Sequence, residues 1–171
     1  MRAFASSTYL LSDARFEVRL VYTAFLVLVV VGFLTMAVFQ LVHIGPTPGR
    51  IAIYYRGGMR EMAMVFPKTF RELVEVTHFH AFIVGVVYLV LAHLFLATIV
   101  PDWLKRAGIV VAFVGLAGDM IGIWLIRYVS AFFAYPQVLF WGCQWVGCAA
   151  LVGVPLREMW LRESRRELPP E

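Results

Sequence analysis

The chain has 171 residues, of which 61% are hydrophobic and 15% charged, and its formal net charge is +4. A soluble domain carries about 45–50% apolar and about 25% charged residues, so this composition excludes an ordinary soluble domain and predicts an integral membrane protein. The positive charge does not indicate a nucleic acid partner, because arginine and lysine flank membrane spans and set their orientation.

Long apolar segments predict four transmembrane helices, at residues 20–42, 77–100, 107–128 and 137–156. Each is near the length of about 20 residues that crosses a hydrocarbon core of roughly 30 Å. We therefore expect an all-α fold, a four-transmembrane-helix bundle in which residues 1–171 form a single membrane domain. The first span is too long for the apolar part of a signal peptide, so no cleavage is expected.

The connection between the first two spans, residues 44–76, is too long for a simple link and should have structure of its own. Residues 51–55 within it are amphipathic, and a group of methionines follows: Met59, Met62 and Met64. We expect this outer loop to lie on the membrane surface, with the methionines, Ile51, Tyr54 and Tyr55 dipping into the lipid.

The second span begins with a strong helix start signal. Thr69 and Glu72 have the spacing of a capping box, in which a hydroxyl and a carboxylate satisfy the first free amides. Three of the four histidines lie on this helix: His78, His80 and His93. Ionisable side chains inside a span are costly, and by default they mark a functional site.

Asp119 lies in the middle of the third span and has two interpretations. At similar depths are Tyr88 on the second span and Gln144 on the fourth, so the three side chains could form a structural hydrogen-bonded cluster. The alternative is a carboxylate that relays protons or serves a quinone site.

Four spans place both termini on one side of the membrane. The excess of arginine and lysine there favours the cytoplasmic side of an inner membrane, with residues 157–171 as a cytoplasmic tail.

The histidines near the outer ends of the spans suggest a haem b site. His43 closes the first span, and His78 and His80 begin the second, so His43 could pair with either as axial ligands. Arg127 and Arg71 lie near the same face and could hold the propionates. His93 has no second histidine at its depth, so a haem there would need another subunit.

Three alternatives to haem remain open. The histidines could be interfacial hydrogen-bonding groups without a ligand. A non-haem metal could use the spacing of Glu72, Glu75 and His78, which resembles half of a di-iron carboxylate site. Copper could be held by the loop methionines together with His78 or His80, because Cu(I) prefers thioether and imidazole ligands.

The stretch from His78 to Gly85 has the form H-x-H-x4-G at the start of a membrane helix. It resembles a motif of small membrane proteins related to haem–copper oxidase and respiratory cytochrome b subunits. The resemblance covers only this helix; it implies a redox association and makes His78 and His80 the first ligand candidates. The chain has too few helices, and too few histidines for a copper partner, to imply oxygen reduction.

These observations predict a b-type cytochrome-like subunit that passes electrons between the quinone pool and a partner at the outer face. The alternative is an accessory subunit of a larger membrane complex, without a cofactor, whose outer loop is a docking surface. Either is a redox or complex subunit rather than a stand-alone enzyme. A transporter is a third hypothesis, although the chain has few polar groups inside its spans and no paired broken helices.

Overall fold

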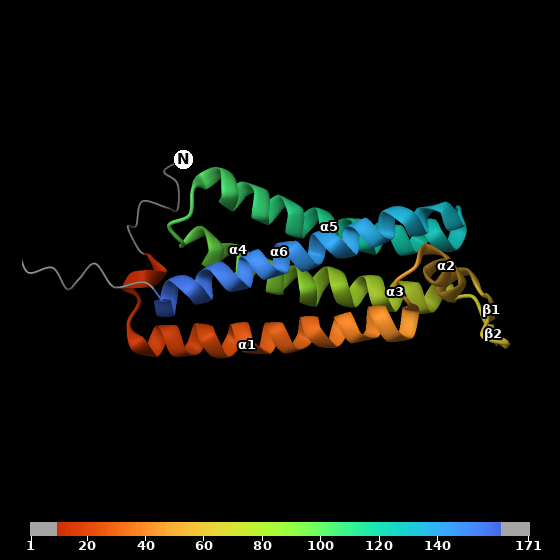
Figure 1. Ribbon diagram of the computed structural model, residues 1–171, viewed down its shortest axis with the longest axis horizontal. Helices are drawn as coiled ribbons and strands as arrows, with labels where there is room; N and C mark the ends of the chain where they lie inside the picture. The colour runs from red at the N-terminus through yellow and green to blue at the C-terminus, as the bar shows by residue number, and fades with distance from the viewer. Residues whose placement is uncertain (1–9, 162–171) are drawn as a thin grey trace, which may run out of the picture.

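Apolar segments in lipid must satisfy their own backbone hydrogen bonds, and here they do so as four long helices (Figure 1). The computed structural model describes residues 10–161. The four spans are Phe16–Ile44, Phe70–Leu96, Asp102–Tyr128 and Ala131–Leu161. The predicted all-α four-helix bundle is confirmed. Most helices begin or end outside the predicted limits, because hydropathy marks only the part of a helix that is apolar enough to lie in lipid.

Two of the spans change their winding part-way. The first consists of α1 (Phe16–Val38) followed by a π-helical segment, η2 (Phe39–Ile44). The second consists of α3 (Phe70–Phe79), a π-helical segment η3 (His80–Val84) and α4 (Gly85–Leu96). The capping box predicted at the start of α3 is present in full. The other spans are α5 (Asp102–Tyr128) and α6 (Ala134–Leu161), joined by a short 3-10 turn, η4 (Ala131–Phe133).

Helices α5 and α6 pack closely because glycines line their interface. A Cβ atom on Gly115 would lie 2.6 Å from the backbone nitrogen of Gln144, and one on Gly147 would lie 2.6 Å from the Cα of Ala112. Backbone atoms cannot move aside as a flexible side chain can, so both positions require glycine. Small residues thus bring the two backbones together over much of their length.

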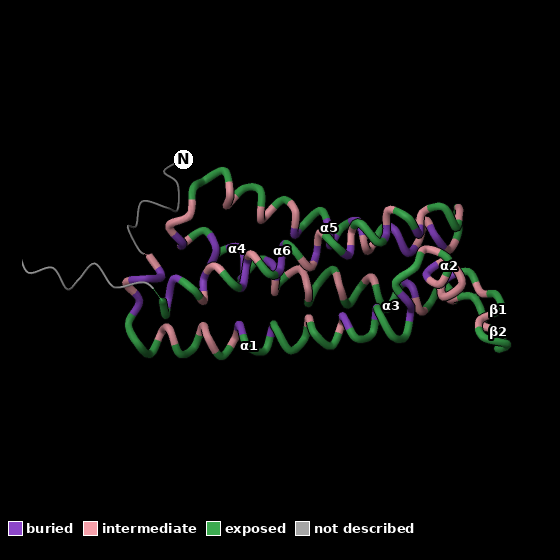
Figure 2. The backbone as a smooth tube through the Cα atoms, viewed as in Figure 1, coloured by how far each residue is buried: buried purple, intermediate pink, exposed green. Residues whose placement is uncertain are grey.

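Helix α1 packs much less tightly than this pair. Most of its apolar side chains are exposed, and Figure 2 shows the exposed colour along most of the helix. Two tryptophans of α6 hold the first span to the bundle, one through α1 and one through η2. Trp160 donates a hydrogen bond to Thr23 (2.9 Å), and Trp145 donates one to the side-chain oxygen of Gln40 (3.2 Å).

The loop between the first two spans is structured, as predicted. It contains α2 (Pro48–Arg56) and an antiparallel hairpin of β1 (Gly58–Arg60) and β2 (Ala63–Val65). The prediction that α2 dips into the lipid is wrong for Ile51 and Tyr55. Both are buried in a small core formed with the ends of α5 and α6, so α2 closes this end of the bundle, here called the loop end.

Arginines of the loop complete the ends of two helices. The Arg56 guanidinium donates to the carbonyl of Ile126 (2.9 Å), and Arg60 donates to the carbonyl of His43 (2.7 Å). The last carbonyls of a helix lack partners within it and carry partial negative charge, so a cation placed there stabilises both the helix and the loop.

The opposite end of the bundle, where α1 begins and α6 ends, is held by a carboxylate. The side chain of Glu158 on α6 is buried, and its two oxygens accept the backbone N–H of Ile99 at 2.9 and 3.1 Å. This contact fixes the turn between α4 and α5 against α6. The predicted tail lies on this helix up to Leu161, and residues 162–171 lie outside the described part of the chain.

Candidate functional site

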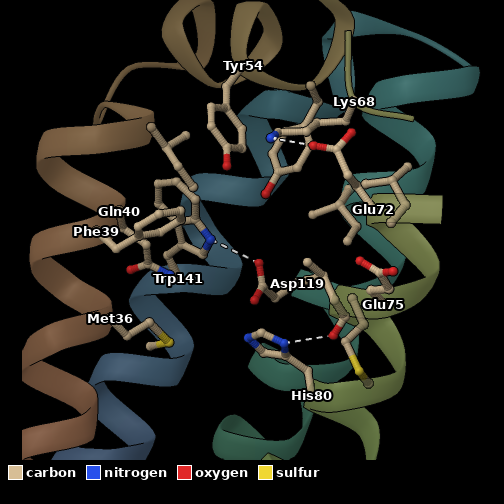
Figure 3. Close-up of a pocket in the computed structure, with 16 residues that line it drawn as sticks. Met36, Phe39, Gln40, Tyr54, Lys68, Glu72, Glu75, His80, Asp119 and Trp141 are labelled. Atoms are coloured by element: carbon tan, nitrogen blue, oxygen red, sulfur yellow. Dashed lines mark hydrogen bonds and ion pairs between the residues drawn. The ribbon is translucent and has the colours of Figure 1, made fainter. Parts of the chain in front are cut away.

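A cavity of about 380 Å³ lies at the loop end, between the helices and beneath α2 (Figure 3). We call it the head cavity. Its polar lining comes from elements far apart in the sequence and consists of Gln40, Tyr54, Tyr55, Lys68, Glu72, Glu75, His80, Asp119 and Trp141. A pocket of this size holds a small molecule, and a few convergent polar groups inside it provide orientation.

Asp119 is the centre of the polar network. Three side chains of α6 donate hydrogen bonds to its carboxylate: Gln137, Trp141 (3.0 Å) and Gln144 (3.4 Å). Because an ionised carboxylate only accepts hydrogen bonds, a set made entirely of donors suits the charged form. The tight α5–α6 interface therefore places a carboxylate and its three donors within the membrane.

His80 faces Asp119 from the second span (Figure 3). Its Nδ1 lies 2.8 Å from the carbonyl oxygen of Val76, which can only accept, so Nδ1 carries the proton. In a neutral imidazole with this tautomer, Nε2 is left as an acceptor. His80 is also the first residue of η3, and Gln40, which lines the same cavity, lies in η2. Single π turns within helices often occur at functional sites.

The loop covers the cavity with a positive charge. Lys68 donates to Glu72 (3.0 Å), and its ammonium lies 4.8 Å from the centre of the Tyr54 ring. Partial burial alone would lower the pKa of Lys68, but the hydrogen bond to Glu72 and the contact with Tyr54 raise it overall. For Tyr55, whose charged form is the deprotonated one, burial raises the pKa. The lysine therefore stays charged and the phenol stays protonated at neutral pH.

An apolar groove of about 490 Å³ adjoins the head cavity, between α1 and the second span. We call it the tail groove; Phe25, Gly32, Phe33, Val84 and Val87 are among its lining residues. Met36 and His80 line both spaces. A polar chamber thus adjoins an apolar channel at the side of the loosely packed helix.

A family described as a transmembrane helical domain, Aq_1264_TM, matches residues 45–166. This range includes the loop and the second, third and fourth spans, and it covers well over half of the chain. The chain belongs to the Aq_1264_TM family. It is therefore an integral membrane protein, as its composition predicts. No curated protein and no solved structure matches the chain.

The Aq_1264_TM region contains Asp119, its three donors, His80 and Lys68, whereas α1 precedes it. The matched region therefore supplies most of the polar lining of the head cavity. The walls of the tail groove come partly from α1 and partly from the matched region.

His43 does not share a cavity with His80. It lines a separate surface pocket with Arg60 and Tyr54, and its ring stacks on Phe39 at 4.9 Å. Tyr54 lines both spaces and meets the His43 ring edge-on at 5.7 Å. The structure thus does not bring these two histidines to opposite sides of one chamber, as a bis-histidine haem requires.

His78 and His93 both point away from the bundle. His78 is exposed and packs on the ring of Phe82 at 5.0 Å. His93 is exposed, and its Nδ1 donates to the carbonyl of Leu89 at 2.7 Å. Neither histidine lines the head cavity.

The arginines predicted to hold propionates are already paired within the fold. Arg127 donates to the carbonyl of Lys68 (2.7 Å), and Arg71 pairs with Glu75 (2.8 Å). The residues present therefore do not fit a haem b held by two histidines of one chain.

The described residues also do not gather a non-haem metal site made of His, Cys, Asp or Glu side chains. Within residues 10–161, no group of three or more His, Cys, Asp or Glu side chains is placed to hold a metal ion. Glu72 is engaged in the capping box and with Lys68, and Glu75 pairs with Arg71. The loop methionines lie on the hairpin, away from the head cavity that His80 lines.

The predicted cluster of Asp119, Gln144 and Tyr88 is right for Gln144 and wrong for Tyr88. The Tyr88 hydroxyl has no hydrogen-bond partner among the described residues, and its ring packs between Phe33 and Phe113. Sequence reasoning missed Gln137 and Trp141. Residues 137, 141 and 144 have i, i+4, i+7 spacing, so a polar stripe on α6 was the signal that could have found them.

Proposed function

We propose that this chain binds a membrane quinone or quinol as a subunit of a larger redox complex. The ring would occupy the head cavity and the isoprenoid tail would lie in the tail groove. The observation that carries the proposal is the position of Asp119, a carboxylate held by three donors and facing His80, in a chamber that adjoins an apolar groove. A quinone has a polar ring and an apolar tail, so a polar cavity that adjoins an apolar groove favours this ligand class.

The head cavity offers what each redox form of the ring needs. A quinol has two hydroxyl donors, and Asp119 and the Nε2 of His80 are acceptors. A quinone has two carbonyl acceptors, and the phenol hydroxyls of Tyr54 and Tyr55 line the loop side of the cavity and can donate to them. Oxidation of a quinol releases two protons and two electrons. Asp119 and His80 would accept the protons, and a redox centre of a partner subunit would accept the electrons.

We place the chain in an inner membrane with both termini in the cytoplasm and the loop end outside. The overall excess of basic residues at the terminal end supports this orientation. Several basic residues at the loop end are used by the fold itself, since Arg56 and Arg60 of the loop and Arg127 at the end of α5 donate to backbone carbonyls. A basic loop is therefore compatible with the outer side, and protons from a bound quinol would leave there.

The tail groove gives the first test. Gly32 lies on the groove, and a Cβ there would meet nothing within 4 Å, so Gly32→Leu should fold and fill the groove. We expect this variant to weaken binding of a menaquinone with several isoprene units about tenfold or more, and to leave a tail-free naphthoquinone unaffected. Gly142→Leu is the matched control, because that position is also open and lies away from both spaces. Binding is measured by equilibrium titration in nanodiscs.

The head cavity gives the second test. Asp119→Asn and His80→Gln should weaken both ligands about tenfold to a hundredfold, the effect of losing a hydrogen bond to a charged or well-placed group. His93→Gln, on the lipid-facing side of the same span, should have no effect. If neither cavity variant alters binding, or if the wild-type chain binds no quinone, the proposal fails and a cofactor-free accessory subunit becomes the better account.

The cytochrome hypothesis has a test of its own. Because His43 and His80 line different spaces, a haem at His80 would need its second axial ligand from another chain. We therefore expect no sharp b-type α band in the reduced-minus-oxidised spectrum of the isolated chain after expression with ample haem. A band at near one haem per chain, lost in His43→Ala and His80→Ala, would overturn this placement of the ligands.

A further inference from the structure

The β1–β2 hairpin carries an unusual set of side chains for its position. Three of the seven methionines of the chain lie on it, and Met59, Met62 and Met64 are 62%, 98% and 68% exposed. The hairpin extends from the loop end past the helices, along the bundle axis (Figure 1). Packing within the bundle does not explain these three side chains, because none contributes to a buried core.

The strand register places two of the three methionines side by side, and the third lies in the turn that joins the strands. Met59 and Met64 are directly opposite in the strand register, so their side chains lie on the same face. Glu61 and Met62 form the two-residue turn, and both have positive φ (51° and 65°), as in a type I′ turn. The pair next to such a turn, here Arg60 and Ala63, is a hydrogen-bonded pair. The following pair, Met59 and Met64, is therefore a non-hydrogen-bonded pair, in which the Cα atoms are closer, about 4.5 Å apart.

The other face of the hairpin is turned to the protein. Arg60 lies on that face and donates to the carbonyl of His43, which fixes which side faces outward. The only carboxylate of the hairpin, Glu61, lies 2.6 Å from Arg50 and 3.8 Å from Arg60. The outward face therefore presents neutral thioethers, while the hard oxygen ligand is paired with arginine.

We propose that this face binds Cu(I) through the sulfur atoms of Met59, Met62 and Met64. Thioethers are soft ligands that select Cu(I) over Zn(II), Mg(II) and other hard or borderline ions. Only metal–sulfur bonds form, and no electron is transferred. The site is separate from the head cavity, whose lining includes none of the three methionines.

The test is competition for Cu(I) against the chelator bicinchoninate, with purified full-length protein and no quinone. The wild-type chain should bind one Cu(I). The triple variant Met59→Leu, Met62→Leu, Met64→Leu should lose at least tenfold in affinity, and Met159→Leu, a buried position far from the hairpin, should keep wild-type affinity. Leucine keeps the volume and apolar character of methionine, so the variants should fold.

A second variant tests the geometry rather than the number of methionines. Exchanging neighbours, with Ala63→Met and Met64→Ala, keeps three methionines but moves one thioether to the opposite face of the strand. We expect a loss of Cu(I) affinity close to that of the triple leucine variant. Absence of Cu(I) binding by the wild type, or unchanged affinity in either variant, would overturn the site.

Discussion

The α5–α6 pair and helix α1 show two ways of building a membrane bundle. The pair is held by glycines that admit a neighbouring backbone and by three hydrogen bonds to one carboxylate. Helix α1 relies on shallow apolar contact and one tryptophan hydrogen bond, and a second tryptophan bonds to η2, which continues it. Lipid is as apolar as leucine, so apolar side chains alone give little reason for helices to associate, and close approach and polar contacts decide which pairs are tight.

This difference matters for the proposed site. A carboxylate that accepts protons needs fixed donors, which the rigid pair supplies. The tail groove lies on the side of α1, whose apolar side chains are mostly exposed. The head cavity, which Asp119 of the tight pair lines, meets the tail groove between α1 and the second span, at Met36 and His80.

The largest effect should come from filling the tight interface. Gly147→Leu would place side-chain atoms against the backbone of Ala112, which cannot move without separating α5 from α6. We expect loss of most folded protein, a cost above the usual range of about 1–3 kcal/mol for overpacking. Gly153→Leu, at an open position on the same helix, is the control and should keep the wild-type melting temperature. Equal melting temperatures for the two variants would contradict the close packing described here.

A smaller loss should follow from removing one donor to Asp119. Gln137→Leu keeps roughly the volume of the side chain but leaves the buried carboxylate with two donors, from Trp141 and Gln144. We expect destabilisation of about 1–3 kcal/mol, measured as the free energy of unfolding in mixed micelles. A neutral result would mean that the hydrogen bond from Gln137 contributes nothing to holding the pair.

Removing the hydrogen bond between α1 and Trp160 should lower stability less and more locally. Thr23→Val removes the acceptor for Trp160, an exposed neutral hydrogen bond worth about 0.5–1.5 kcal/mol. Amide hydrogen exchange should increase in α1 and stay unchanged in α5 and α6. Faster exchange throughout the bundle would show that α1 is coupled to the pair more strongly than its contacts indicate.

The smallest effect is expected on the outer face of α1. Leu34 is 57% exposed and lines neither the head cavity nor the tail groove. Leu34→Ala should therefore change the free energy of unfolding by less than about 0.5 kcal/mol. A loss comparable to that of Gln137→Leu would indicate that this face packs against another protein rather than lipid.

The elements that the sequence predicted are those that depend on local chemistry. The spans follow from length and hydropathy, and the start of α3 follows from Thr69 and Glu72 alone. The burial of Ile51 and Tyr55 depended on how α2 folds back over the bundle, which no local pattern reports. Its amphipathic face fits a membrane surface and a protein surface equally well.

The site was predictable only in part. Asp119 and His80 stood out because charged or ionisable groups are rare within spans. Their partners did not stand out, because the hydrogen bonds of Gln137 and Trp141 to Asp119 depend on which face of α6 packs on α5. Depth alone placed Tyr88 beside Asp119, but the rotation of the second span turns its ring toward Phe33 and Phe113.

The π turn at His80–Val84 has a consequence for how the chain tolerates changes of length. A π turn holds one residue more than the α-helix needs to advance by the same hydrogen-bonded step. Deleting Ala81 would let the segment close into regular α-helix and leave α4 in its present register relative to α3. The same deletion inside α5 would rotate every later side chain by about 100°. The second span can thus lose a residue at this turn and keep its fold, whereas the third span cannot.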